Sequence, residues 1–189
     1  WNLKVVAAPN VSLQNPPNFC ETAELMPMLQ TNTGDVTKYL WSFPGGTPSS
    51  FEGLNSPKIK YNTPGPYTYT LQVVAPCDTI NLSKTFTIFS KSPISFINVP
   101  TKFCKSSSRD TLKANPSGGK WSGNGIIDAD LGIFDPAIVN AGIHKITYTF
   151  GPTECQSIGT IDIEVVNASP VTTTNTILCI NSPITQLEA

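Results

Sequence analysis

One pattern occurs twice in this chain, begins a third time, and limits the possible folds more than any other feature. The segments NFCETAELMPML, KFCKSSSRDTLK and ILCINSPITQLE each place a cysteine after an apolar residue and an apolar side chain eight positions after that cysteine. These cysteines are Cys20, Cys104 and Cys179, at steps of 84 and 75 residues. Repetition at this period predicts a tandem array of small domains.

Further segments repeat in the same order and set the expected boundaries. PGPYTYTLQV corresponds to AGIHKITYTF, while WNLKVVAAPNVSL, KTFTIFSKSPISF and TIDIEVVNASPVTT each run through a proline junction into the next unit. We therefore expect the end of a preceding repeat at 1–8, whole repeats at 9–91 and 92–168, and the truncated start of a following repeat at 169–189. Short junctions that contain proline favour an extended rod.

The segments within each repeat alternate with a period of two. YTYTLQVV, KTFTIFS, HKITYTF and TIDIEVV are rich in β-branched and aromatic residues, which favours strands. Clusters such as FPGGTPSS, NTPGPY and NPSGG separate them and are typical of turns. DLGIFDPAIVNAG comes nearest to a helical pattern, but Gly132 and Pro136 interrupt it. The sequence therefore predicts an all-β chain of antiparallel sandwiches with little helix.

The composition argues against several classes of partner. Only 13% of the residues are charged, with 12 basic against 13 acidic, so the surface has no basic patch for nucleic acid or anionic lipid. No apolar run approaches the roughly 18 residues that a transmembrane helix needs. We expect no nucleic-acid partner and no membrane insertion in this segment.

The repeated motifs resemble a known family. YLWSFPGGTPSS followed by SPKIKYNTPGPYTYTLQVV resembles the polycystic-kidney-disease (PKD) domain, whose signature is W-x-F-G/P-G-G followed by Y-x-x-P-G-x-Y-x-V-x-L-x-V. FCKSSSRDTLKANPSGGKWSGNGI with FDPAIVNAGIHKITYTF is similar to the related repeat of Bacteroidota cell-surface adhesins, the SprB-like gliding-motility family among them. The resemblance covers nearly the whole chain. It implies tandem immunoglobulin-like (PKD-type) antiparallel β-sandwiches outside the cell.

The resemblance also implies a function without catalysis. We expect a structural or adhesive repeat segment, a stalk or filament, of a large cell-surface protein that is secreted through the outer membrane and acts in cell adhesion or gliding motility. The alternative is an accessory binding or spacer module of a secreted enzyme that degrades polysaccharide or protein. The expected partners are neighbouring repeats of the same chain, and surface glycans or other cell-surface proteins.

Trp41 and Trp121 lie where the third strand of each repeat should run. In immunoglobulin-like sandwiches a tryptophan on this strand packs between the sheets, so we expect both in the core and not in a ligand platform. Counted from the preceding glycine, His144 takes the position that Tyr67 takes in the first repeat. Such folds place there a tyrosine corner, whose polar tip bonds back to the backbone. His144 is expected to replace that tyrosine in a structural role.

Candidate catalytic residues are scarce. With one histidine, no Ser-His-Asp or Cys-His set can be assembled, and Glu21 and Glu24 sit on no recognisable cleft. We therefore expect that the segment is not an enzyme.

One acidic loop and two threonines are candidates for other chemistry. DADLGIFD places Asp128, Asp130 and Asp135 around a glycine, but calcium takes six to eight oxygens, so a turn capped by Asp135 is favoured over a calcium site. No cofactor is expected. DTI and DTL resemble the Asp-Ser/Thr-aliphatic acceptor of Bacteroidota O-glycosylation, which makes Thr79 and Thr111 hypothetical acceptors.

The five cysteines are expected to pair, as is usual in an exported protein. One assignment joins Cys20 to Cys77 and Cys104 to Cys155 within each repeat. In an immunoglobulin-like order, however, these partners lie at opposite ends of a domain, roughly 23 Å apart for seven residues of strand, and a disulfide permits about 7 Å between Cα atoms. We favour Cys20–Cys155 across the junction, with the partners of Cys77, Cys104 and Cys179 in flanking domains, and we keep the first assignment as the alternative.

Overall fold

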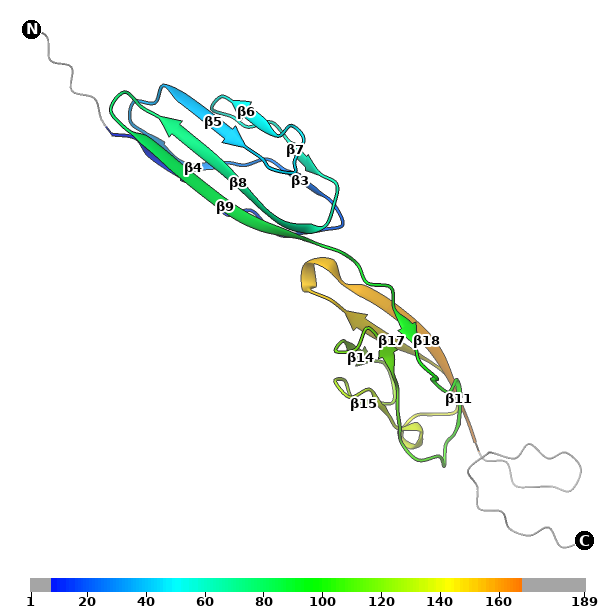
Figure 1. Ribbon diagram of the computed structural model, residues 1–189. Helices are drawn as coiled ribbons and strands as arrows, with labels where there is room; N and C mark the ends of the chain where they lie inside the picture. Colours follow the sequence, from blue (N-terminus) through cyan, green and yellow to red (C-terminus); the bar gives the residue numbers. More distant parts are fainter. Residues whose placement is uncertain (1–7, 168–189) are drawn as a thin grey trace, which may run out of the picture. The chain divides into compact units, whose positions relative to one another are not determined.

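The computed structural model describes residues 8–167 (Figure 1). Its regular elements are strands and two single 3-10 turns, so the described chain is all-β. The chain forms two compact units. Unit 1 comprises the residues up to Lys91 together with Pro152–Cys155, and unit 2 comprises Ser92–Gly151 and the residues from Gln156 on. A short stretch from the second repeat of the sequence therefore belongs to unit 1.

The described part of unit 1 contains nine strands arranged as a sandwich. One layer is a five-stranded sheet in the order β2-β9-β8-β5-β6, and the other consists of the pairs β1-β4 and β3-β7. Most pairs are antiparallel, but β2 runs parallel to β9. The strands are β1 (Asn10–Leu13), β2 (Phe19–Cys20), β3 (Ala23–Leu25), β4 (Leu29–Thr33), β5 (Lys38–Ser42), β6 (Ser50–Glu52), β7 (Ile59–Tyr61), β8 (Gly65–Val74) and β9 (Thr79–Phe89).

Strand β8 shows how the sequence pattern produces this layering. Tyr69, Leu71 and Val73 are buried, whereas the alternating Thr68 and Thr70 are exposed. Successive side chains of a strand point to opposite faces of its sheet, so the apolar set lies against the second layer. The threonine hydroxyl groups of β8 therefore lie on the exposed face of the sheet.

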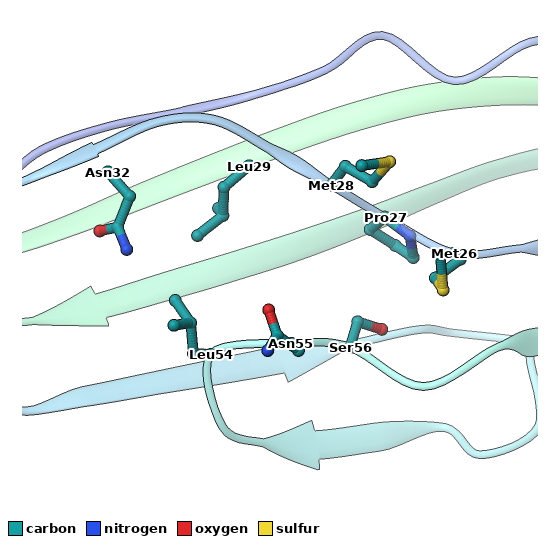
Figure 2. A pocket seen from close by; sticks show the side chains of 8 residues that line it. All are labelled: Met26, Pro27, Met28, Leu29, Asn32, Leu54, Asn55 and Ser56. Atoms are coloured by element: carbon teal, nitrogen blue, oxygen red, sulfur yellow. The ribbon is translucent and has the colours of Figure 1, made fainter.

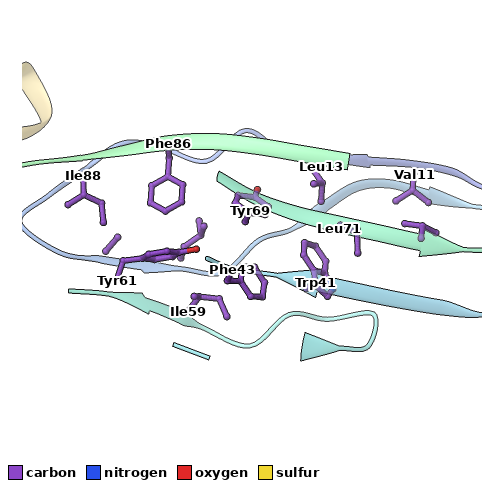
Figure 3. Packing of buried hydrophobic residues seen from close by; sticks show 13 residues of the cluster. Val11, Leu13, Trp41, Phe43, Ile59, Tyr61, Tyr69, Leu71, Phe86 and Ile88 are labelled. Carbon is purple, nitrogen blue, oxygen red and sulfur yellow. The ribbon is translucent and has the colours of Figure 1, made fainter. Parts of the chain in front are cut away.

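Aromatic rings fill the centre of unit 1 (Figure 3). Trp41 on β5 is 3% exposed and stacks on Phe43, with ring centroids 5.9 Å apart. Its indole Nε1 donates a hydrogen bond of 3.0 Å to the carbonyl of Gly53, so burial leaves this donor satisfied. Burial raises the pKa of Tyr61 and of Tyr69 to about 12, and in each case a neighbouring tyrosine adds to the shift.

Unit 2 repeats this plan with shorter strands. A four-stranded sheet in the order β11-β18-β17-β14 is accompanied by the three-stranded sheet β12-β16-β15 and the pair β10-β13. As β2 does in unit 1, β11 runs parallel to the last strand of its unit. The elements are β10 (Ser95–Phe96), β11 (Lys102–Cys104), β12 (Asp110–Thr111), β13 (Ala114–Asn115), β14 (Lys120–Ser122), β15 (Ile126–Asp128), β16 (Ile133–Phe134), η1 (Pro136–Ile138), β17 (Gly142–Phe150) and β18 (Ser157–Val166). The 3-10 turn η2 (Thr153–Cys155) lies between β17 and β18 in sequence and belongs to unit 1.

Trp121 on β14 is the counterpart of Trp41 and is 4% exposed. Its ring lies 4.7 Å from that of Tyr148 and 5.7 Å from that of Phe96, measured between centroids. Gly132 adopts a positive φ of 71° against the indole, and a Cβ atom there would meet Nε1 at 2.6 Å. Only glycine therefore leaves room for the buried ring at this turn.

We predict that Trp121→Ala lowers the free energy of unfolding of unit 2 by about 3–5 kcal/mol, because it removes a large buried ring and leaves a cavity. Urea unfolding with a probe specific to each unit measures the change. The matched control is Ile143→Ala, since Ile143 is 73% exposed in the same unit and should change stability by no more than about 0.5 kcal/mol. Unchanged unfolding of unit 2 in the Trp121 variant would contradict its place in the core.

Candidate functional site

A pocket opens on the surface of unit 1, between the segment that links β3 to β4 and the loop that links β6 to β7 (Figure 2). Its volume is about 460 Å³. Figure 2 shows the two groups of side chains on opposite walls of the pocket. The lining residues are Met26, Pro27, Met28, Leu29, Asn32, Leu54, Asn55 and Ser56.

The core of unit 1 holds both walls of this pocket in place. Gly53, at the start of the β6–β7 loop, accepts the hydrogen bond from the Trp41 indole and donates its N–H to the carbonyl of Tyr39 at 2.9 Å. The hydroxyl of Tyr39 in turn donates to Asn32 Oδ1 at 2.6 Å, on the other wall. The pocket is therefore tied to β5, which carries Trp41 and Tyr39.

The pocket is apolar and uncharged. Met26, Met28 and Leu54 are 52%, 54% and 44% exposed, and they are the large apolar side chains exposed in the described part of unit 1. Asn32 and Asn55 are the amides available for hydrogen bonds at its rim. No charged side chain and no histidine lines it, and the hydroxyl of its one serine, Ser56, donates to the carbonyl of Pro57 at 3.0 Å. The site can accept an apolar group and fix its orientation through an amide.

Sequence reasoning did not find this pocket. Met28 occupies the same repeat position as Leu112, eight residues after a cysteine, yet Leu112 is 2% exposed and Met28 is 54% exposed. The sequence does contain one signal for this pocket, the segment Met26-Pro27-Met28. It places two adaptable apolar side chains on either side of a proline that interrupts strand pairing.

Tyr67 and His144 make equivalent contacts in the two units. The hydroxyl of Tyr67 donates to the carbonyl of Thr63 at 2.9 Å, four residues upstream. His144 Nε2 lies 2.7 Å from the carbonyl of Asn140, also four residues upstream, so this nitrogen carries the proton and donates. Both side chains are half-buried. The histidine thus makes the backbone contact of a tyrosine corner.

The two acidic residues considered for catalysis are bound to basic or backbone groups. Glu24 forms ion pairs of 3.5 Å with Lys58 and Lys60. Glu21 accepts a hydrogen bond from the backbone N–H of Lys91. The structure does not bring these two carboxylates together in the pocket.

The structure also separates the carboxylates of the acidic loop considered for calcium. Asp128 Oδ1 accepts the backbone N–H groups of Asp130 and Leu131, both at 2.9 Å. Asp130 pairs with Lys120. Among the described residues, the group of metal-ligand side chains that converges is Cys20, Glu21 and Cys155, not this loop. Each carboxylate of the loop has a protein partner of its own, so we do not propose a calcium site here.

Asp135 is the buried acid of this loop, with 8% of its side chain exposed. Its Oδ2 accepts a hydrogen bond of 2.8 Å from Arg109 Nε, and its Oδ1 accepts the N–H of Ala137 at 3.0 Å and so caps η1. The hydrogen bond from Arg109, followed by that from Ala137, holds the pKa of Asp135 below its ordinary value.

Cys20 and Cys155 form a disulfide bond, with their Cα atoms 4.9 Å apart. Cys20 pairs with Phe89 at the end of β9, whereas Cys77 precedes the start of that strand at Thr79. The alternative Cys20–Cys77 bridge is therefore not formed, and Cys77 is free and exposed. Because both sulfurs are bonded to each other, the Cys20, Glu21 and Cys155 group offers no thiolate for a metal.

Two further cysteines were expected to pair in flanking domains. Cys104 is also disulfide-bonded. Cys179 lies outside the described residues.

The two hypothetical glycosylation sites share one local geometry. Asp78 Oδ1 accepts the backbone N–H of Thr79 at 2.7 Å, and Asp110 Oδ1 accepts that of Thr111 at 2.7 Å. Thr79 opens β9 and Thr111 closes β12, and both threonines are exposed. Each hydroxyl group is accessible to a modifying enzyme in this fold.

Comparison with known proteins addresses the fold of the first repeat. Residues 2–88 match the family model of the PKD domain. This match and the repeated strand order support tandem PKD-like, immunoglobulin-like sandwiches. PKD domains and immunoglobulin-like folds are typically non-catalytic modules. No curated protein sequence matches the chain.

Two solved structures are similar to the chain in fold. Extracellular domains 3-5 of Drosophila OTK share 10% identity over 88% of this chain, with a TM-score of 0.48. This chain spans 64% of the length of that Drosophila chain. Fibronectin(III)-like modules of Clostridium thermocellum CbhA share 11% identity over 89% of this chain and all of that one, with a TM-score of 0.44. At these TM-scores the fold assignment rests on the strand order and the PKD match.

We predict that unit 2 loses stability in acid through Asp135. A carboxyl group whose pKa is lowered by folding stabilises the fold above its unfolded pKa, near 4, and this contribution is lost as the pH falls through the folded pKa. Arg109→Met removes the main cause of the shift, so the decline in unfolding free energy between pH 5 and pH 2 should become shallower.

The control for this measurement is Lys102→Met. Lys102 pairs with Glu164 at 3.1 Å in the same unit, but 57% and 46% of these side chains are exposed. A pair so exposed contributes little to stability, so the pH profile should keep its shape. Equal flattening by both substitutions would show that Asp135 has no special part in acid stability.

Proposed function

We propose that this chain is a non-catalytic stalk or filament segment of a large extracellular protein, related to the SprB-like adhesins of Bacteroidota and acting in cell adhesion or gliding motility. The observation that carries the proposal is repetition: one sandwich plan occurs twice in the described part of the chain. Tandem modules of this kind extend a protein in one dimension, and their function depends on length and mechanical strength.

The arrangement of terminal strands supports a mechanical role. In each unit an early strand runs parallel to the last strand, with Phe19 opposite Ile88 in unit 1 and Phe103 opposite Val165 in unit 2. Opposite pulls on the two ends of a repeat slide such parallel strands along each other. Where no disulfide bond carries the load in their place, the hydrogen bonds between them are loaded together and not one after another.

An extracellular location fits the covalent chemistry. Disulfide bonds persist in oxidising compartments, and Cys20–Cys155 is such a bond. No helix within residues 8–167 has the length and hydropathy to span a membrane. We propose that the protein is secreted through the outer membrane and displayed on the cell surface.

The second candidate function is an accessory binding module of a secreted enzyme that degrades polysaccharide or protein. The pocket of unit 1 favours it, because exposed methionines can adapt to the apolar part of a surface glycan or of another cell-surface protein. A catalytic domain elsewhere in the full-length gene product would support this candidate. Many more repeats and a C-terminal secretion domain would support the stalk.

We predict that the segment is extended in solution. Two sandwiches end to end should give a radius of gyration clearly above the roughly 16 Å of one compact globule of 189 residues. Small-angle X-ray scattering measures this directly, at several concentrations to exclude association. A value near 16 Å would be incompatible with a stalk.

We also propose that Thr79 and Thr111 carry O-linked glycans in the native organism. Intact-mass measurement of native material should then exceed the mass of the bare polypeptide, and Thr79→Val with Thr111→Val should remove the excess. The matched control is Thr68→Val, which replaces an exposed strand threonine that no aspartate precedes. A native mass equal to that of the polypeptide would rule out the modification.

A further inference from the structure

We propose that the Cys20–Cys155 bond removes residues 21–154 from the path that carries tension along the chain. The bond joins residues 135 positions apart in sequence. A pull on the two ends of the chain passes through every covalent link that connects them by the shortest route. With the bond formed, that route runs along the chain to Cys20, across the two sulfurs, and onward from Cys155. The inference deepens the proposed stalk function and rests on it for its use in the cell.

The shielded loop contains most of the folded chain. It includes strands β3 to β9 of unit 1, the junction at Lys91, and strands β10 to β17 of unit 2. The tension-bearing route keeps β1 and β2 before the bond and β18 after it. Neither Trp41 nor Trp121 lies on that route. Each core also contains residues that do lie on it: Val11 and Leu13 in unit 1, and Ile163 and Val165 in unit 2.

The effect on extension is large. A fully extended chain spans about 3.4 Å per residue, so residues 8–167 without the bond could stretch to about 540 Å. With the bond, the route consists of residues 8–20 and 155–167 and reaches about 90 Å. The bond therefore withholds about 460 Å of chain, whether or not the two units remain folded.

The environment of the two cysteines suits a lasting bond. Cys155 is 2% exposed, and Cys20 is half-buried in the short strand that pairs with the end of β9. The backbone N–H of the next residue, Glu21, donates to the carbonyl of Phe89 at 2.8 Å. A buried disulfide is less accessible to an attacking thiolate than an exposed one. The contrast within this chain is Cys77, which is exposed and free.

Reduction would convert this inextensible segment into an extensible one. A dithiol reductant that gives two electrons and two protons to the bond yields two thiols and is itself oxidised to a cyclic disulfide. Residues 21–154 then join the tension-bearing route, and their units unfold under sufficient force. Tension is afterwards resisted by the parallel strand pairs β2–β9 and β11–β18 and no longer by a covalent bond.

Single-molecule force spectroscopy on the whole chain tests this inference. The chain is held by its two ends between handle domains of known unfolding length, in a background with Cys77→Ser, Cys104→Ser and Cys179→Ser, so that only one bond can form. The oxidised background should reach no more than the short route allows. Cys20→Ser should release about 460 Å more. Addition of dithiothreitol to the oxidised molecules should release the same length, although their amino-acid sequence is unchanged.

The comparison between oxidised and reduced molecules decides the outcome. An oxidised chain that releases as much length as the Cys20→Ser chain would overturn the inference. The result is independent of the stalk proposal. If scattering shows a compact chain while force spectroscopy shows a shielded loop, the stalk proposal is wrong and the shielding proposal is confirmed. If the chain is extended but the loop is not shielded, the shielding proposal is wrong and the stalk proposal remains.

Discussion

The covalent bond between Cys20 and Cys155 is the constraint on which the rest of the structure depends. It starts from the short strand β2, which pairs with the end of β9, where the chain leaves unit 1. It also fixes Pro152–Cys155 to unit 1, although the chain on both sides of that stretch belongs to unit 2. Cys20 from the first repeat of the sequence and Cys155 from the second therefore both lie in unit 1. Two covalent connections join the repeats: the backbone at Lys91 and the disulfide bond.

In the described part of each unit a buried indole lies among the aromatic rings of the core. The sequence predicts both tryptophans from their place on the third strand, and the structure buries Trp41 and Trp121 against neighbouring aromatic rings. The indole of Trp41 also bonds the loop that forms one wall of the surface pocket. Packing and surface chemistry are thus connected in unit 1, because the ring that fills the core also positions Leu54 and Asn55 through Gly53.

The sequence predicts the parts of this structure that depend on periodicity and repetition. Alternating residues such as those of β8 reveal which face is buried, and the repeat places His144 where Tyr67 lies. It does not reveal which segment covers a given side chain, so Met28 was not recognised as part of a pocket. It shows the aspartates of the acidic loop but not their partners, because Lys120 and Arg109 come from other segments.

The disulfide map tests the account most directly. Cleavage at lysine and glutamate separates all five cysteines into different peptides, so each pair is identifiable by mass under non-reducing conditions. The account predicts a linked peptide that joins Cys20 to Cys155. A linked peptide that joins Cys20 to Cys77 would contradict it, because the whole length of β9 lies between these two residues in the fold. In that case no disulfide bond would join Cys20 to the second repeat, and residues 21–154 would not be shielded from tension.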